Sequence, residues 1–197
     1  MRKLIQWNLL TLDGYFEGEK KWQLDFHHYF WGKEMEAFSI EQLKSADMLL
    51  FGRITYEGMA AYWQKATDEV AGYMNHLPKV VFSRTLDRAD WTNTRLVKDD
   101  AMGAVRELKS QDGRNLFVFG SGDLCAQLAE NGLFDEYRIG LFPVIQGKGK
   151  TLFGRGNEPD KAGVDGGAAA FDGSCDIEIQ AACRMKLLLN FDCSMVK

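Results

Sequence analysis

The chain has 197 residues, of which 46% are hydrophobic and 26% charged, and its net charge is −4. This length suits one domain with a sizeable core, and the lack of a long basic stripe in the sequence argues against nucleic-acid binding. The first residues, MRKLIQWNLL, are too short and too interrupted an apolar run for a signal peptide or a membrane span, so we expect a cytoplasmic protein without membrane contact.

Short apolar runs that end in small or turn-forming residues predict strands, and apolar residues at helical spacing predict helices. Strands are expected at 3–10, 48–51, 79–82, 96–97, 115–119 and 137–142. Helices are expected at 33–46, 55–62 and 66–76, after the Asp99-Asp100 pair, and after the turn at 120–123. Because strands alternate with helices over residues 1–142, we predict an α/β fold with a mostly parallel sheet covered on both faces.

The C-terminal part of the sequence has a different character. Residues 154–175 are rich in Gly, Ala and Asp, which is typical of a flexible loop. Two apolar runs follow, at 177–182 and 186–193, with little room for a helix between them. We therefore expect an antiparallel hairpin at one edge of the sheet, within a single domain that spans residues 1–197.

One kind of turn occurs three times, each time where an apolar strand ends. The turns are Phe51-Gly52-Arg53, Phe82-Ser83-Arg84-Thr85 and Phe119-Gly120-Ser121-Gly122. In a parallel sheet such turns lie at the carboxyl ends of strands, where ligands bind, and a helix that starts there offers free N–H groups to a phosphate. The guanidinium groups of Arg53 and Arg84 can add paired hydrogen bonds. A tight turn with solvated arginines is the alternative for each turn taken alone.

Several segments together resemble the dihydrofolate reductase superfamily. They are Thr11-Leu12-Asp13-Gly14, Gly52-Arg53-Ile54-Thr55-Tyr56-Glu57, Gly120-Ser121-Gly122-Asp123-Leu124, Leu133-Phe134-Asp135-Glu136-Tyr137 and the run from Pro143 to Phe153. The last two are similar to the signature of one branch, which contains the C-terminal reductase domain of the bifunctional deaminase–reductase of riboflavin synthesis and many stand-alone bacterial proteins. The resemblance covers about residues 1–153.

This resemblance implies a three-layer fold, with NADPH lying across a central mixed sheet and a small, heterocyclic substrate beside it. It also implies a homodimer. The residues that it assigns to the cofactor are Gly52, Arg53, Thr55, Ser83, Arg84, Gly120, Ser121, Gly122, Asp123 and Leu124.

Two positions depart from the riboflavin branch. That branch usually has a lysine four residues before the position of Thr11, where this chain has Trp7. It also usually has an acidic residue just before the paired glycines, where this chain has Phe119. Both differences argue against the riboflavin precursor as substrate.

Asp13 is the candidate catalytic residue, as a proton donor or an orienting group, because it follows the first strand, where the family places nicotinamide and substrate. The alternative is a turn aspartate that caps its own loop. Next comes an aromatic segment in which Trp22, Phe26 and His27 are candidates for holding a flat substrate, with His27 or His28 as a possible proton donor. The alternative is a hydrophobic loop folded onto the core or into a dimer interface.

The sequence therefore favours an NADPH-dependent reductase of a small molecule. A nucleotide-binding homodimer without turnover is the main alternative, and a structural dimer whose aromatic loop binds another protein is a third. None of the four cysteines forms a C-x-x-C pair, so we expect reduced thiols and no metal site.

Overall fold

The computed structural model describes residues 1–29, 31–152 and 176–181. The main strands are β1 (Leu4–Thr11), β3 (Ala46–Gly52), β4 (Lys79–Phe82), β5 (Thr94–Val97), β6 (Asn115–Phe119), β7 (Glu136–Phe142) and β9 (Asp176–Ala181). The helices are η1 (Asp25–Tyr29, a 3-10 helix), α1 (Lys33–Ser45), α2 (Arg53–Trp63), α3 (Glu69–His76), α4 (Ala101–Ser110) and α5 (Gly122–Glu130). A small second sheet pairs β2 (Tyr15–Glu17) antiparallel with β8 (Lys150–Thr151).

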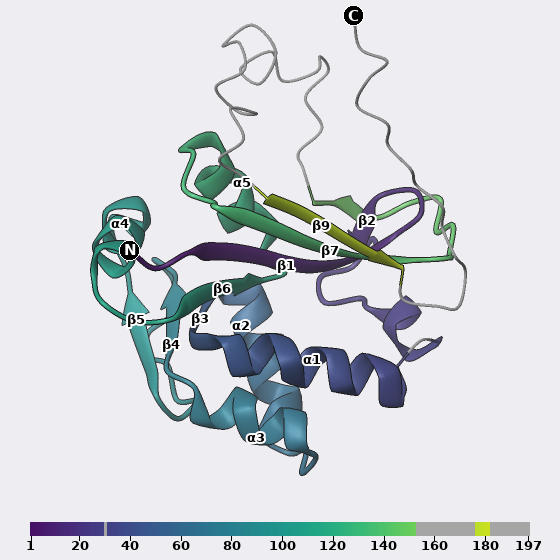
Figure 1. The fold of residues 1–197 in the computed structure, drawn as a ribbon, viewed down its shortest axis with the longest axis horizontal. Helices are drawn as coiled ribbons and strands as arrows, with labels where there is room; N and C mark the ends of the chain where they lie inside the picture. Colours follow the sequence, from purple (N-terminus) through teal and green to yellow (C-terminus); the bar gives the residue numbers. More distant parts are fainter. Residues whose placement is uncertain (30, 153–175, 182–197) are drawn as a thin grey trace, which may run out of the picture.

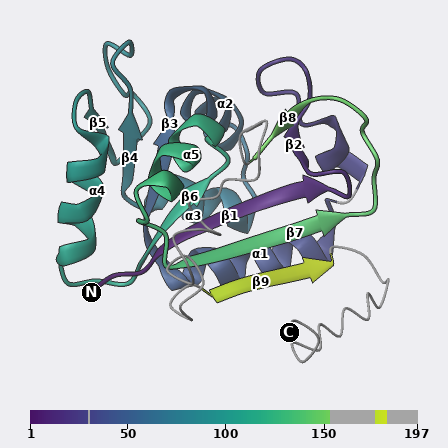
Figure 2. The same cartoon turned by 90° about the horizontal axis from the view of Figure 1, so that it is seen from above.

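The seven main strands form one sheet in the order β5-β4-β3-β6-β1-β7-β9, with every neighbouring pair parallel (Figure 1). Seen from above, β1, β7 and β9 run side by side in one direction (Figure 2). The chain leaves β1 to build one half of the sheet outward to β5, and then returns with β6 between β3 and β1. Such a reversal of strand order opens a crevice at the carboxyl ends of the strands.

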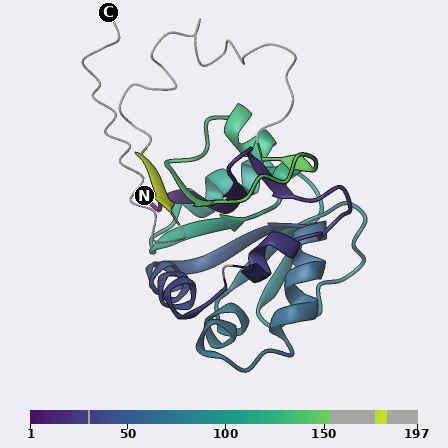
Figure 3. The ribbon, with the colours of Figure 1, turned by 90° about the vertical axis from the view of Figure 1, so that its right-hand side faces the viewer.

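Helices cover both faces of the sheet, because successive side chains of a buried strand point to opposite sides. On one face, Leu49 and Phe51 of β3 pack in a cluster with residues of α1, α2 and α3. On the other face, Leu50 of the same strand packs with residues of α4 and α5. Figure 3 shows the two helical layers on either side of the sheet. The predicted three-layer α/β architecture is confirmed.

The strand at 176–181 agrees with the predicted run at 177–182, and it lies at the sheet edge, parallel to β7. The second strand of the predicted hairpin, at 186–193, and the loop at 154–175 lie outside the described residues. Within the described part, the antiparallel pairing is that of β2 with β8, whose two strands are distant in the sequence. Among the helices of that same part, no helix is both long and apolar enough to cross a bilayer.

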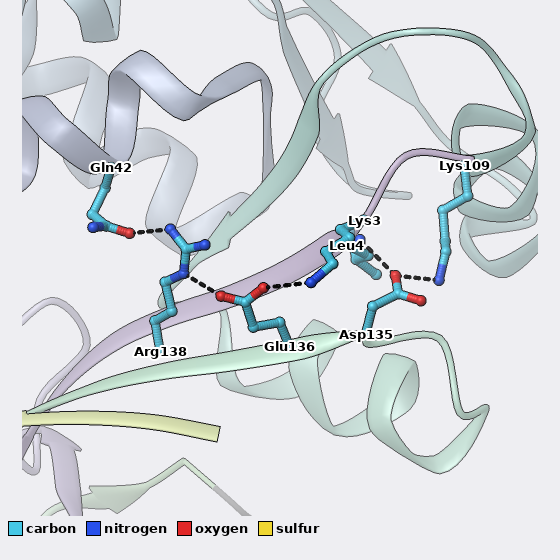
Figure 4. Close-up of polar contacts among 7 residues, drawn as sticks. All are labelled: Lys3, Leu4, Gln42, Lys109, Asp135, Glu136 and Arg138. Carbon is cyan, nitrogen blue, oxygen red and sulfur yellow. Dashed lines mark hydrogen bonds and ion pairs between the residues drawn. The ribbon is translucent and has the colours of Figure 1, made fainter. Parts of the chain in front are cut away.

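At the amino ends of β1 and β7, the adjacent carboxylates of Asp135 and Glu136 bind different partners (Figure 4). Asp135 accepts a hydrogen bond from the backbone N–H of Leu4 at 2.7 Å and pairs with Lys109 of α4 at 2.6 Å. Glu136 pairs with Lys3 at 3.2 Å and with Arg138, whose guanidinium also reaches Gln42 of α1. These contacts fasten β1, β7 and two helices together at the end of the sheet opposite the three turns.

Candidate functional site

A cleft of about 580 Å³ lies at the carboxyl ends of β3, β4, β5 and β6, and β2 and β8 form one of its walls. All predicted cofactor residues except Gly120 line this cleft. The lining residues are Phe16, Glu17, Gly52, Arg53, Ile54, Thr55, Phe82, Ser83, Arg84, Val97, Lys98, Asp100, Ala101, Met102, Ser121, Gly122, Asp123, Leu124, Gln127 and Lys150. The three turns therefore meet at one site, as their sequence pattern predicts.

Side-chain hydroxyls join the first and third turns. The hydroxyl of Ser121 accepts a hydrogen bond from the backbone N–H of Gly52 at 2.9 Å and donates one to the carbonyl of Phe119 at 3.0 Å. The hydroxyl oxygen of Thr55 accepts a hydrogen bond from the backbone N–H of Ser121 at 3.0 Å. Both side chains are buried. Ser121 and Thr55 therefore hold the two turns in a fixed relation, a task that the sequence pattern did not reveal.

Gly120 does not line the cleft itself, and its backbone conformation and close contacts require a glycine in this turn. Its φ is +54°, in the left-handed region, and a Cβ at this position would lie 3.3 Å from the side chain of Thr55. Its N–H donates to the side-chain oxygen of Asn8 on β1 at 2.8 Å. Gly120 thus lets the third turn pack against both β1 and the first turn.

Two helices begin at the cleft without a side-chain cap. These are α2, which follows Gly52, and α5, which follows Ser121. By contrast, α3 and α4 begin at Asp68 and Asp100, whose carboxylates each accept a hydrogen bond from the first turn of the helix. The first N–H groups of a helix have no partner inside it, and the helix dipole makes this end partly positive. Two such ends facing one cleft favour an anionic ligand.

Cationic side chains add to this potential. Arg53 lies in the first turn of α2 and forms an exposed ion pair with Glu57 at 3.2 Å, one helical turn away. Lys150 pairs with Asp123 at 3.0 Å across the cleft wall. Arg84 and Lys98 also line the cleft, and neither forms an ion pair with another residue that the structure describes.

Lys98 and the wall formed by β2 and β8 were not predicted from the sequence. Lys98 directly follows β5, which was predicted as only two residues. In the wall, Phe16 packs so close to α5 that a Cβ on Gly122 would lie 2.9 Å from its ring. Gly149 has a φ of +149°, and a Cβ there would lie 2.3 Å from the carbonyl oxygen of Glu17. The glycine-containing run after Pro143 therefore serves to seat β8 against β2.

Asp13 does not line the cleft. Its carboxylate accepts hydrogen bonds from the hydroxyl of Thr11 at 2.6 Å and from the backbone N–H groups of Gln146 at 3.1 Å and Gly147 at 2.7 Å. Its slight burial raises the pKa, but these hydrogen bonds outweigh that effect, and the pKa of Asp13 lies below its usual value. The contacts give Asp13 a structural task, tying the first loop to the turn that precedes β8, and its catalytic role stays a prediction.

The predicted substrate residues Trp22, Phe26 and His27 lie outside the cleft. Trp22 has a φ of 64°, which is rare for a bulky residue, and its backbone N–H donates a hydrogen bond to the buried carboxylate of Glu17. Its ring lies against α2, where a Cβ on Gly58 would come within 2.1 Å of it. The structure therefore fixes the start of the aromatic segment on α2.

Phe26 and His27 of η1 lie against the sheet on the side of α1. Phe26 is buried in a cluster with Met35 and Phe142. The imidazole of His27 is 4.5 Å from the Phe26 ring, and burial, with a smaller effect of His28, lowers its pKa from 6.5 to about 4. His27 is therefore neutral near pH 7, which weakens its case as a proton donor at that pH.

The two residues at which this chain differs from the riboflavin branch, Trp7 and Phe119, are in direct contact. Trp7 and Phe119 are register partners on β1 and β6, and their rings meet edge to face with 4.8 Å between centroids. Trp7 also packs against Phe38 of α1, with 5.9 Å between the rings. An aromatic pair therefore lies beside the third turn.

The geometry defines an α/β protein with a nucleotide-sized, anion-attracting cleft at the carboxyl ends of a parallel sheet. A family model, the RibD C-terminal domain, matches residues 2–164. The chain therefore belongs to the RibD C-terminal domain family, and the family resemblance seen in the sequence is confirmed.

Individual relatives agree with this assignment. The uncharacterised protein YyaP of Bacillus subtilis (strain 168) is 29% identical over 157 residues, which cover 77% of this chain and 80% of YyaP. Among solved structures, a putative riboflavin biosynthesis protein from Shewanella sp. PV-4 is similar with a TM-score of 0.64 and 22% identity, over 80% of this chain and 86% of that protein. A dihydrofolate reductase from Enterococcus faecalis, solved with NADP(H), has a TM-score of 0.52 and 15% identity, over 81% and 80% of the two chains. These structures show the shared fold.

Proposed function

We propose that this protein is an NADPH-dependent oxidoreductase that transfers a hydride to a small, heterocyclic substrate. The observation that carries the proposal is the cleft where the uncapped amino ends of α2 and α5 meet, flanked by Arg53, Arg84 and Lys98. Its volume of about 580 Å³ lies in the range of small-molecule and cofactor sites. The family assignment and the NADP(H)-containing neighbour support the choice of cofactor.

The residues present fit the parts of this cofactor. The N–H groups at the starts of α2 and α5 would hold the pyrophosphate, because the Ser121 and Thr55 hydroxyls keep the two helix ends together. The part of the cleft lined by Arg84 and Lys98 would bind the adenosine, and Arg53 would join them in binding its 2′-phosphate. The part lined by Phe16 and Gly122 would bind the nicotinamide.

When bound, NADPH would supply the hydride. The protein would bind and orient the cofactor and the substrate, and it would exclude water from them. The substrate would lie next to the nicotinamide, at the end of the cleft lined by Phe16 and Gly122. We further propose that the protein acts as a homodimer, on the family resemblance alone.

A binding protein without turnover is the second candidate, and the Trp7–Phe119 pair favours it, because neither ring can move a proton. The test has two stages. Thermal unfolding with NADPH, NADH or no ligand measures binding, and a ligand at one hundred times its dissociation constant adds about 2.7 kcal/mol of stability. Loss of reduced-nicotinamide absorbance with pterins, pyrimidines and quinones then measures turnover. Stabilisation by NADPH with oxidation supports the reductase, stabilisation without oxidation supports the binding protein, and the lack of any shift contradicts both.

A further inference from the structure

A lysine and an aspartate form an ion pair across the start of α5. Lys150 of β8 pairs with Asp123, the second residue of α5, with 3.0 Å between Nζ and Oδ1. Both residues line the cleft, and both side chains are open to water, Lys150 with 40% and Asp123 with 78% of the side chain exposed. Such an exposed pair contributes little to stability. A ligand in the cleft can therefore replace either partner without disturbing the fold.

The stem of Lys150 holds its ammonium group close to the first residue of α5. A Cβ on Gly122 would lie 3.6 Å from Cε of Lys150 and 2.9 Å from the ring of Phe16. Nζ of Lys150 lies 6.0 Å from the centre of the same ring. Because the methylene groups lie along this wall, the ammonium group stays near the start of α5 while its outermost bonds can turn. A cation at this end of a helix needs an anion beside it, because the helix end is itself partly positive.

The first N–H groups of α5 are left without a side-chain acceptor. The helix follows Ser121, whose hydroxyl is hydrogen-bonded to Gly52 and Phe119 instead of capping it. Among the described residues, the carboxylate of Asp123 contacts Lys150 and none of these N–H groups. An anionic ligand at the start of α5 would therefore meet free N–H groups and a lysine, and the carboxylate that holds this lysine would repel it.

We propose that Lys150 binds the diphosphate group of the ligand and that Asp123 competes with this group for Lys150. The inference rests on the proposed function, in which the diphosphate is that of the cofactor. In the free protein, Asp123 neutralises Lys150. When the N–H groups of α5 bind the diphosphate, the ammonium group of Lys150 turns to a phosphate oxygen and forms a charge-assisted hydrogen bond. Lys150 therefore raises the affinity for the cofactor, and Asp123 lowers it although it lines the same cleft.

Calorimetric titration of the full chain with NADPH and with NADH tests this assignment. Lys150→Met should weaken the binding of both cofactors about tenfold, because a charge-assisted contact is lost and Asp123 is left without its counter-charge. Asp123→Asn should strengthen the binding of both about threefold, because the repulsion and the competition for Lys150 disappear. If the pair only held β8 against α5, loss of either partner would loosen the same contact, and both variants would bind more weakly.

Three results would overturn the inference. The first is an affinity of Asp123→Asn that is unchanged or lower. The second is an affinity of Lys150→Met that is unchanged or higher. The third is a loss in Lys150→Met that is confined to NADPH, because both cofactors carry the diphosphate and only NADPH carries the 2′-phosphate.

A second ion pair close to β2 and β8 provides matched controls. Lys148 pairs with Glu19 at 2.7 Å, and neither residue lines the cleft. Lys148→Met and Glu19→Gln change the net charge of the protein by the same amounts as the two test variants, and both affinities should stay at the wild-type value. Circular-dichroism melts without ligand check that all four variants are folded. Equal effects of the two pairs would assign the changes to net charge and overturn the inference.

Titration of the same samples with inorganic pyrophosphate separates this inference from the cofactor proposal. NADPH binding by the wild type, with variant affinities that do not change in opposite directions, sinks only the role of the ion pair. Pyrophosphate binding that Lys150→Met weakens and Asp123→Asn strengthens, without any binding of NADPH, sinks only the cofactor proposal. Binding of neither compound contradicts both.

Discussion

The hydroxyl of Ser121 accepts a hydrogen bond from the backbone N–H of Gly52, 69 residues earlier in the chain, at 2.9 Å. Ser121 also has a φ of 59°. Ser121→Ala should lower the free energy of unfolding by roughly 1–2 kcal/mol, because the hydrogen bond is lost and the left-handed backbone is kept. Ser121→Gly loses the same hydroxyl, but glycine adopts this φ freely. Its free energy of unfolding should therefore exceed that of Ser121→Ala by up to about 1 kcal/mol. Urea unfolding measures both, and the opposite order would contradict this reading.

Arg53 should distinguish NADPH from NADH. Arg53→Ala is expected to weaken NADPH binding roughly tenfold or more, the effect of losing one charge-assisted hydrogen bond, and to change NADH binding less. Fluorescence titration with both cofactors measures this. Arg88→Ala is the control, because Arg88 pairs with Asp90 on the surface and does not line the cleft. An equal loss for NADPH and NADH would remove Arg53 from the 2′-phosphate site.

The contact of Trp22 with Gly58 should be sensitive to a single methyl group. Gly58→Ala places a Cβ within 2.1 Å of the indole in the present packing, so the ring must move, and we expect a loss of about 1–3 kcal/mol in stability. The start of the aromatic segment should also become more susceptible to trypsin, at Lys20 and Lys21. Gly72→Ala is the control, because Gly72 lies in helix α3 with open space around it, and it should be neutral or stabilising. Equal effects of both changes would argue against the packing role of Gly58.

His27 should make the protein sensitive to mild acid. Burial lowers its pKa to about 4, so between pH 6.5 and 4 the unfolded chain binds a proton that the folded protein does not. Folding stability should therefore fall as the pH decreases through this window, by about 2–3 kcal/mol at most. His27→Phe should flatten this part of the stability profile, whereas His76→Gln, at an exposed histidine, should follow the wild type. Parallel profiles for wild type and His27→Phe would show that His27 is accessible to protons.

The sequence predicts which turns meet at the site, but it does not predict the wall formed by β2 and β8. The turns at Gly52, Ser83 and Gly120 follow buried strands, and parallel strands must end at one edge, so local signals suffice to bring them together. The pairing of β2 with β8 joins two short segments about 135 residues apart in the sequence, and neither has a strong apolar pattern of its own. Long-range pairing of this kind leaves little trace in local periodicity.

Side-chain roles were the least predictable feature. Serine and threonine in a glycine turn suit a phosphate ligand. Here, however, the hydroxyl of Ser121 is hydrogen-bonded to Gly52 and Phe119, and the hydroxyl of Thr55 accepts a hydrogen bond from the backbone N–H of Ser121. Asp13 is similar, because its contacts to Gln146 and Gly147 join segments that are distant in the sequence, and no local pattern reveals them. The contact between Trp7 and Phe119 likewise requires the register of β1 with β6, which no local pattern contains.

A crystal structure with NADPH tests the central claim most directly. The proposal predicts pyrophosphate oxygens within about 2.7–3.2 Å of the first N–H groups of α2 and α5, with the adenosine toward Arg84 and Lys98. A fully bound NADPH elsewhere on the protein, or a cleft that stays empty at saturating NADPH, would contradict it.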